Sequence, residues 1–204
     1  ASRQEIDISG LDVFGIGYYR LNIAEPMHKL NSVESLVALR DTFFAEHSEI
    51  RNYGQEITTF TGGANPDYYL AFERFLDMLE ASLERDPTPF SNRVYVLKQH
   101  PAAIKKGNAD RKLLESRIEK LRSHCDSFHF VVCDGELSTP EMLALSDCVI
   151  YHQTSMAPQF VFGNVPRVIK TGPKEEGDLL TALKFPIAHD VDSFLVAITA
   201  PQKG

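Results

Sequence analysis

Two short polar segments interrupt apolar runs at points where a buried strand would end. The first is QHP at residues 99–101, which follows the run 93–98. The second is HQTS at residues 152–155, which lies between the apolar runs 148–151 and 157–162. Imidazole, amide and hydroxyl groups next to a helix start are groups that bind a phosphate. The two segments therefore predict an anion site.

The hydroxyl pair Thr154 and Ser155 has two interpretations. Both precede the apolar run 157–162, which we expect to form a short helix. A helix start presents free N–H groups and a partial positive charge, and the hydroxyls would add donors to a phosphate, with Gln153 beside them. The same hydroxyls also suit a simple helix cap, which is a common structural role. The residue types leave both interpretations open.

His100, Gly62 and Gly63 are the other candidates. His100 precedes a proline, which favours an extended backbone, and its imidazole could donate to a phosphate oxygen. Gly62 and Gly63 follow the strand-like run 56–60, and glycines there let the backbone approach a ligand closely. A plain tight turn explains them equally well, because the chain has neither a G-x-G-x-x-G nor a Walker motif.

Other chemistries find no support in the residue pattern. The seven histidines form no H-E-x-x-H motif or clustered ligand spacing, so we expect no metal and no cofactor. No G-x-S-x-G elbow occurs, and Cys133 has no activating base nearby in the sequence. We expect Glu136, Glu141 and Asp147 to be helix-start charges rather than paired catalytic carboxylates.

Strand-like and helix-like runs alternate from residue 56 onward. Strands are expected at 56–60, 93–98, 128–133, 148–151 and 167–170, helices at 67–85, 112–124, 142–145 and 178–183, and a closing unit at 185–198. We expect Thr139 to cap the helix that begins at Pro140. This alternation predicts an α/β fold: a three-layer, Rossmann-like, mainly parallel sheet covered on both faces.

A parallel sheet would bring the candidate residues together. Ligands of such sheets bind at the carboxyl ends of the strands, near the point where the strand order reverses. The segments 61–63, 99–101, 134–136 and 152–155 each follow an expected strand. All four should therefore lie along one edge of the sheet.

The length of 204 residues suits a single α/β domain, residues 1–204. Residues 56–198 carry the clear alternation and form its core. Residues 1–55 form a lead-in segment with a weaker pattern, in which we expect a strand at 11–16 and a helix at 34–44 capped by Ser32.

Composition excludes several classes of protein. The formal net charge of −7 and the absence of a concentrated basic face argue against nucleic-acid binding. No apolar run approaches the ~20 residues of a membrane span, and no signal peptide opens the chain. Three cysteines without a C-x-x-C pair fit a reducing compartment, so we expect a cytoplasmic protein.

Two stretches resemble a known family. VYVLKQHP at 94–101 and LALSDCVIYHQTSMAPQFVFGNVPRVI at 143–169 resemble the C-terminal, donor-binding half of GT-B glycosyltransferases and the related UDP-N-acetylglucosamine 2-epimerases. The His-Pro pair followed by a Ser/Thr pair is closest to bacterial sialyltransferases and capsule polymerases. The resemblance covers residues 57–198, and the order and spacing of its motifs carry more weight than any one of them.

The resemblance implies a nucleotide-sugar-binding domain of a glycosyltransferase. His100, Thr154 and Ser155 would contact the donor phosphates, and the loop with Gly62 and Gly63 would lie at the interdomain cleft. Many relatives hold the ribose with a glutamate where this chain has Gln159.

The resemblance also implies that this chain is incomplete as an enzyme. A GT-B enzyme has two such domains, so transfer would require an acceptor domain, a separate subunit or a homo-oligomer. The alternatives are an epimerase-type enzyme acting on the same ligands and a non-catalytic interaction domain that has kept the fold.

Overall fold

A computed structural model describes residues 32–50, 56–135, 137–154, 156–162, 165–173 and 184–200. The expected strand at 11–16 and the expected helix at 178–183 lie outside these residues. The alternation predicted from residue 56 onward is present in the described part of the chain.

Six parallel strands form one sheet with the order β3-β2-β1-β4-β5-β6. The strands are β1 (Glu56–Thr61), β2 (Arg93–Lys98), β3 (His129–Cys133), β4 (Cys148–Tyr151), β5 (Arg167–Thr171) and β6 (Ile187–Ala188). β1 pairs with β2 in the register Glu56↔Arg93 and with β4 in the register Thr58↔Cys148. The order reverses between β1 and β4, because β2 and β3 lie on one side of β1 and the later strands on the other.

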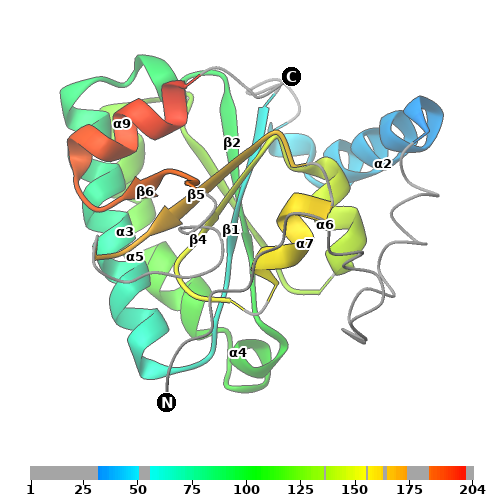
Figure 1. Cartoon of the computed structure of the whole chain (residues 1–204), viewed down its shortest axis with the longest axis horizontal. Coiled ribbons are helices and arrows are strands. Elements are labelled where there is room, and N and C mark those ends of the chain that lie inside the picture. The colour runs from blue at the N-terminus through cyan, green and yellow to red at the C-terminus, as the bar shows by residue number, and fades with distance from the viewer. Residues whose placement is uncertain are drawn as a thin grey trace.

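Helices cover both faces of the sheet, which makes a three-layer domain (Figure 1). One face carries α3 (Pro66–Arg85), α5 (Ala109–His124) and α9 (Val191–Thr199), and the other carries α2 (Val33–Glu46), α6 (Thr139–Leu145) and α7 (Ala157–Phe162). Short elements complete the described chain: α4 (Pro101–Lys105) and the 3-10 turns η3 (Ser48–Ile50) and η4 (Thr88–Phe90). The predicted fold class is confirmed.

Local capping chemistry sets the helix ends. Ser32 caps α2 as predicted, and its side chain accepts a hydrogen bond from the Ser35 N–H. The prediction for α6 is wrong by one residue, because Ser138, and not Thr139, is the N-cap. Ser138 forms a capping box with Glu141, a reciprocal pair of bonds that Thr139 at the first helical position cannot make.

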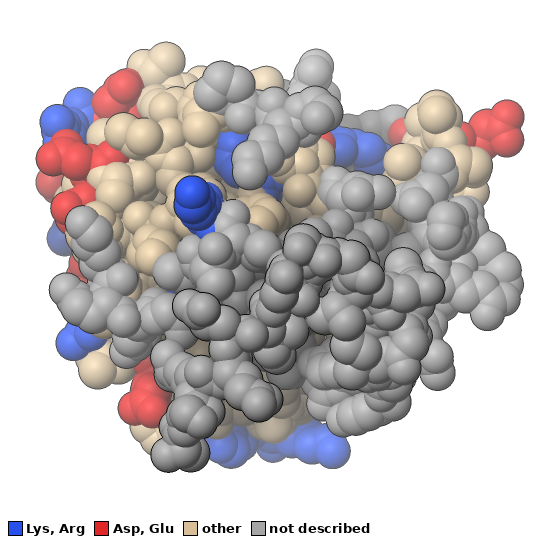
Figure 2. Space-filling model, viewed as in Figure 1, with Lys and Arg blue, Asp and Glu red and all other residues tan. Residues whose placement is uncertain are grey.

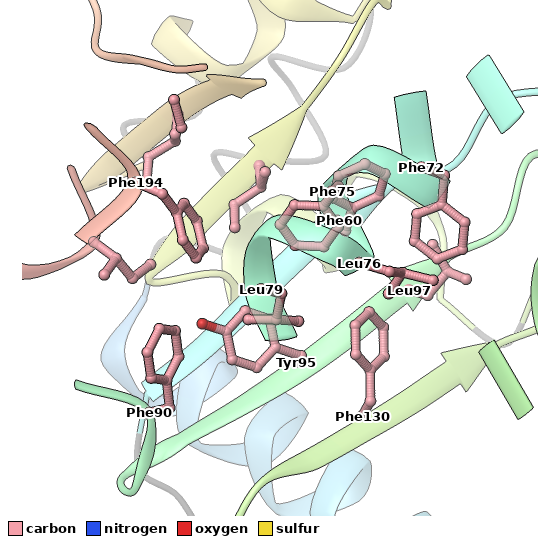
Figure 3. Packing of buried hydrophobic residues seen from close by; sticks show 14 of the residues in the cluster. Phe60, Phe72, Phe75, Leu76, Leu79, Phe90, Tyr95, Leu97, Phe130 and Phe194 are labelled. Carbon is pink, nitrogen blue, oxygen red and sulfur yellow. The ribbon is translucent and has the colours of Figure 1, made fainter. Parts of the chain in front are cut away.

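Aromatic packing builds the core on the α3 face. Phe60 of β1 stacks on Phe75 with ring centroids 4.4 Å apart, and Phe75 contacts Phe194 of α9 edge to face at 5.9 Å (Figure 3). Aromatic pairs of this kind contribute about 0.5–1.5 kcal/mol beyond area burial. This core fixes the start of α3 against the end of β1, and so positions the loop between them.

Two arginines, Arg93 and Arg167, hold the edge of the sheet at which the strands begin. Their side chains are largely buried. The Arg93 guanidinium pairs with Glu56 at 2.6 Å and donates to the carbonyl of Ile198 at 3.4 Å. Arg167 donates to the Ala200 carbonyl at 2.5 Å, so both arginines bind the last turn of α9. Cations at a helix C-terminus satisfy its free carbonyls and complement its dipole.

Charges on the face drawn in Figure 2 are interspersed. Acidic and basic side chains alternate along the side formed by α3, α5 and α9, and a few basic side chains lie over α4. In the described residues, no helix is both long and apolar enough to cross a bilayer.

Candidate functional site

The carboxyl ends of all six strands lie at the same edge of the sheet, as the predicted convergence of the four loops requires. The loop after β1 and the loop after β4 flank the point where the strand order reverses. In open α/β sheets a ligand binds in the crevice at this point. The candidate site is therefore built from the loops after β1, β2 and β4.

Gly62 brings the β1 loop against the β2 loop. Its N–H donates to the Lys98 carbonyl at 2.7 Å, and a Cβ added there would lie 2.7 Å from that same oxygen and 2.9 Å from the His100 nitrogen. Both neighbours are backbone atoms, so neither can move aside cheaply. Gly62 is required for this close approach, which puts it directly beside His100.

Gly63 makes room for an aromatic ring. A Cβ at Gly63 would lie 2.5 Å from the Tyr68 ring, which packs beneath the loop and is itself buried. Tyr68 also stacks on Phe72, so aromatic packing holds the start of α3. The two glycines are therefore explained by packing of the loop, and a ligand contact remains a prediction.

Gly62→Ala should lower the free energy of unfolding by about 1–3 kcal/mol, the usual cost of forcing extra atoms into packed structure. The added methyl group must separate the β1 and β2 loops. Urea denaturation of the wild type and the variant measures the difference. Gly107→Ala is a comparison: its Cβ meets nothing within 4 Å, and its cost should come from the left-handed backbone, φ +88°. An unchanged stability for Gly62→Ala would contradict the packing argument.

His100 is exposed and caps α4. Its Nδ1 accepts a hydrogen bond from the Ala102 N–H at 3.1 Å, so Nδ1 carries no proton in this arrangement. The proton of the neutral ring is then on Nε2, which leaves one donor that can point away from the helix. This geometry is compatible with donation to a phosphate and does not test it.

The loop after β4 shows a cap at Thr154. The Thr154 hydroxyl accepts from the Met156 N–H at 3.2 Å, which is the structural role weighed above. Ser155 lies outside the described residues, and Gln153 is exposed. Thr154 is half-buried, and its oxygen retains capacity to donate a hydrogen bond to a ligand.

Gln159 is buried in α7. The residue is 5% exposed, and its Oε1 has no hydrogen-bond partner among the described residues. A buried amide oxygen without a donor costs about 1–3 kcal/mol, and such a group is often completed by a ligand or water. A role in ribose binding stays a prediction.

A polar network ties the β2 and β3 loops together. The Asp134 carboxylate after β3 accepts from Arg111 at 2.8 Å, from Asn108 at 3.3 Å and from the Gln99 side chain. Lys106 reaches across to the Ala64 carbonyl at 3.1 Å. These bonds occupy Gln99 and fix the loops on the β2 side of the crevice.

Asp110 is an unusual buried acid behind the β1 loop. It has no exposed surface, and within the described part of the chain neither carboxylate oxygen has a hydrogen-bond partner that meets normal geometry. Burial raises the pKa of Asp110 to about 6, and the nearby Tyr68 hydroxyl opposes part of that rise. Burial, and then Asp110 itself, in turn raises the pKa of Tyr68 well above its usual value.

Asp110→Asn should therefore gain stability relative to wild type as the pH rises. The folded protein holds the Asp110 proton up to a pKa of about 6, whereas an unfolded chain releases it near 3.8. Between these values wild type loses about 2–3 kcal/mol that the uncharged variant does not lose. Denaturation of wild type and variant at pH 4 and at pH 7 gives the difference in their free energies of unfolding at each pH. Asp126→Asn, at an exposed position, is the control. A difference that is the same at both pH values would contradict the raised pKa.

His152 opens the HQTS segment at 152–155, but the residue pattern gives it no role of its own there. It directly follows β4, is 8% exposed, and its Nδ1 lies 3.0 Å from the Thr171 carbonyl of β5. Alternation along β4 places His152 on the α3 face, and Tyr151 on the other face. The orientation of the ring could not be predicted, because it depends on a carbonyl 19 residues away in the sequence.

The structure also disfavours Asp147 as a catalytic carboxylate of this site and Cys148 as a nucleophile. Asp147 accepts from the Ile57 N–H at 2.7 Å at the amino edge of the sheet, so it lies away from the candidate site. Burial raises the pKa of the Cys148 thiol to about 12, which makes it a poor nucleophile.

One group of potential metal ligands exists among the described residues. Glu80, Glu84 and His124 lie together between α3 and α5. The Glu80 carboxylate already pairs with Arg117 at 2.8 Å and with Lys120. These two cations disfavour a divalent ion there, so the cluster is better described as an ion-pair network.

The strand order is 3-2-1-4-5-6, helices cover both faces, and the loops after β1 and β4 flank the switch point, which is where the strand order reverses. These features define a Rossmann-like domain. It is the fold of one half of a GT-B glycosyltransferase, such as the C-terminal half, and the predicted resemblance is confirmed at the level of the fold.

Several solved structures that this chain resembles are proteins of trehalose phosphate metabolism. The α,α-trehalose 6-phosphate synthase from Burkholderia multivorans has a TM-score of 0.64 at 12% identity, over 90% of this chain and 41% of that one. The N-terminal domain of Candida albicans trehalose-6-phosphate phosphatase has a TM-score of 0.58 at 15% identity, over 88% and 41%.

A third structure contains a ligand. The E. coli protein described as "trehalose-6-phosphate … bound with UDP-2-fluoro glucose" has a TM-score of 0.55 at 12% identity, over 79% of this chain and 40% of that one. This chain thus spans about two fifths of the length of these structures. No family model and no curated protein matches the sequence.

Proposed function

We propose that this chain is a nucleotide-sugar-binding domain of a glycosyltransferase. The observation that carries the proposal is the switch point between β1 and β4, flanked by a glycine loop on one side and a hydroxyl-bearing loop on the other. The fold similarity to a structure bound with UDP-2-fluoro glucose supports the same class of ligand.

The phosphate groups of the donor would lie over the start of α3. This helix has 20 residues, begins at Pro66 shortly after Gly63, and is capped by Asn65, whose side chain accepts from the Tyr68 N–H. Because Pro66 has no N–H, the Asp67 N–H is the donor of the first turn that would face an anion, together with the positive end of the helix dipole. Thr154 and Ser155 would contact the phosphates from the β4 side, and His100 from the β2 side.

A second Rossmann-like half would supply the acceptor site. This proposal rests on length, because the chain spans 41% of the Burkholderia multivorans synthase structure. The partner would be a further domain, a separate subunit or a second copy of this chain. We place the protein in the cytoplasm as part of the same proposal, since Cys125, Cys133 and Cys148 are all free thiols.

A thermal-shift screen of the chain against UDP-, CMP- and GDP-sugars tests the function. A nucleotide at about 100 times its Kd should stabilise the fold by about 2.7 kcal/mol. His100→Ala should reduce the shift. Arg85→Gln, at the end of α3 that is farther from the candidate site, should leave it unchanged.

The screen also separates the alternatives. An epimerase-type enzyme would bind UDP-sugars and change their configuration, which NMR of the sugar after incubation would detect. A non-catalytic domain that has only kept the fold would show no shift with any nucleotide sugar. That last result would overturn the proposed function.

A further inference from the structure

A small pocket lies beside the candidate site, on the α3 face of the sheet. It has a volume of about 200 Å³ and is enclosed by α3 and the carboxyl ends of β4, β5 and β6. Ligand pockets for drug-sized molecules measure about 300–1,000 Å³, so this one is too small for a nucleotide. It has room for a molecule of about one ring.

His152 supplies an oriented ring nitrogen to this pocket. A peptide carbonyl only accepts hydrogen bonds, so the contact of 3.0 Å to the Thr171 oxygen requires the proton of the neutral ring on Nδ1. Nε2 has no partner among the described residues and is then an acceptor. A buried imidazole held in this way can bind a ligand hydroxyl.

Arg74 supplies the positive charge. It lines the pocket from α3, is exposed, and forms no ion pair or hydrogen bond with another described residue. His189 also lines the pocket, but its Nε2 lies 3.3 Å from the Asp190 carboxylate, which would neutralise it when protonated. Arg74 is therefore the group that would attract an anion, and a planar guanidinium matches a carboxylate or phosphate.

The α3 wall that carries Arg74 also has apolar side chains. Phe75 and Met78 belong to it, and Phe75 is fixed by its contacts with Phe60 and Phe194 (Figure 3). An aromatic or thioether wall suits the C–H face of a sugar ring, because that face is apolar while the ring edge carries hydroxyls.

We propose that this pocket binds a single sugar ring that carries an acidic group. Arg74 pairs with its carboxylate or phosphate, the His152 Nε2 accepts from a hydroxyl, and Met78, supported by the buried Phe75, packs on the ring. The pocket is defined without reference to a bound nucleotide, so the proposal stands apart from the proposed function. The acidic sugar is either a free molecule or the sugar part of a nucleotide donor held by the neighbouring β4 loop.

Calorimetric titration of the chain with glucuronate, glucose 1-phosphate and neutral glucose tests the chemical class. The two acidic sugars should bind at least tenfold more tightly than glucose. Arg74→Gln, an exposed change that should not disturb folding, should remove most of that difference. His152→Asn keeps a donor for the Thr171 carbonyl and removes the Nε2 acceptor, so it should weaken all three sugars. Arg85→Gln is the matched control on the same helix and should change none of them.

A comparison of UDP with UDP-glucuronate identifies the source. If free acidic sugars bind alone, the pocket is a separate sugar site. If they do not, but UDP-glucuronate binds more tightly than UDP and Arg74→Gln cancels that advantage, the pocket holds the donor sugar. Equal affinity for glucose and the acids, no effect of Arg74→Gln, or no binding in either form would overturn the proposal. Failure of UDP alone to bind would count only against the nucleotide site.

Discussion

Replacing Thr154 and Ser155 together by alanine should weaken nucleotide binding at least tenfold. Hydrogen bonds to a charged group contribute about 1.5–3 kcal/mol each, and the proposed phosphate contacts would lose two donors. Because Thr154 also accepts from the Met156 N–H at 3.2 Å, the variant should lose about 1 kcal/mol of fold stability as well. Calorimetric titration measures the first effect and thermal melts measure the second.

The two effects can occur separately, which makes the variant informative. Thr88→Ala in η4, a threonine remote from the carboxyl edge, is a control for general loss of a hydroxyl. Lost stability with unchanged nucleotide affinity would mean that the loop after β4 is a helix cap and nothing more.

Arg93→Ala should lower the free energy of unfolding by about 3–5 kcal/mol. The guanidinium is 8% exposed and contacts four groups: the Glu56 carboxylate, the Thr58 hydroxyl and the carbonyls of Pro89 and Ile198. Its removal leaves these groups at the amino edge of the sheet without their donor. Urea denaturation measures the loss.

Arg85→Ala is the matched control for this prediction. Arg85 also forms an ion pair with an acid, Asp192 of α9, but both side chains are more than half exposed. Surface pairs contribute about 0–1 kcal/mol, so this variant should remain close to wild type. Equal losses for the two variants would contradict the importance of burial.

The elements of the core were predictable because their patterns are local. The strand Arg93–Lys98 has the predicted bounds, and the helix Pro66–Arg85 begins one residue before its predicted start. Apolar periodicity and the cap residues carry this information within a few positions. The sequence predicted a mainly parallel sheet but not the order of its strands, because the reversal between β1 and β4 depends on long-range pairing.

The groups that sequence patterns missed depend on partners far along the chain. His152 is oriented by a carbonyl of the next strand, and Arg93 is bound to a helix 105 residues later. Asp110 lies outside the expected helix 112–124, and its complete burial in the first turn of α5 is what makes it unusual. Such contacts are set by tertiary packing, which leaves no mark on spacing or composition.

The reversal of strand order has a consequence for how the protein is made. Residues 90 positions apart, Ile57 and Asp147, are brought together when β4 docks on β1. At a synthesis rate of about 5–20 residues per second, β1 leaves the ribosome several seconds before its neighbour exists. Closing so long a segment also costs about 4 kcal/mol of chain entropy. The ligand crevice is therefore assembled late. In a nascent or truncated chain with only β1, β2 and β3, β1 would be an edge strand, open on the side where β4 and the crevice should be.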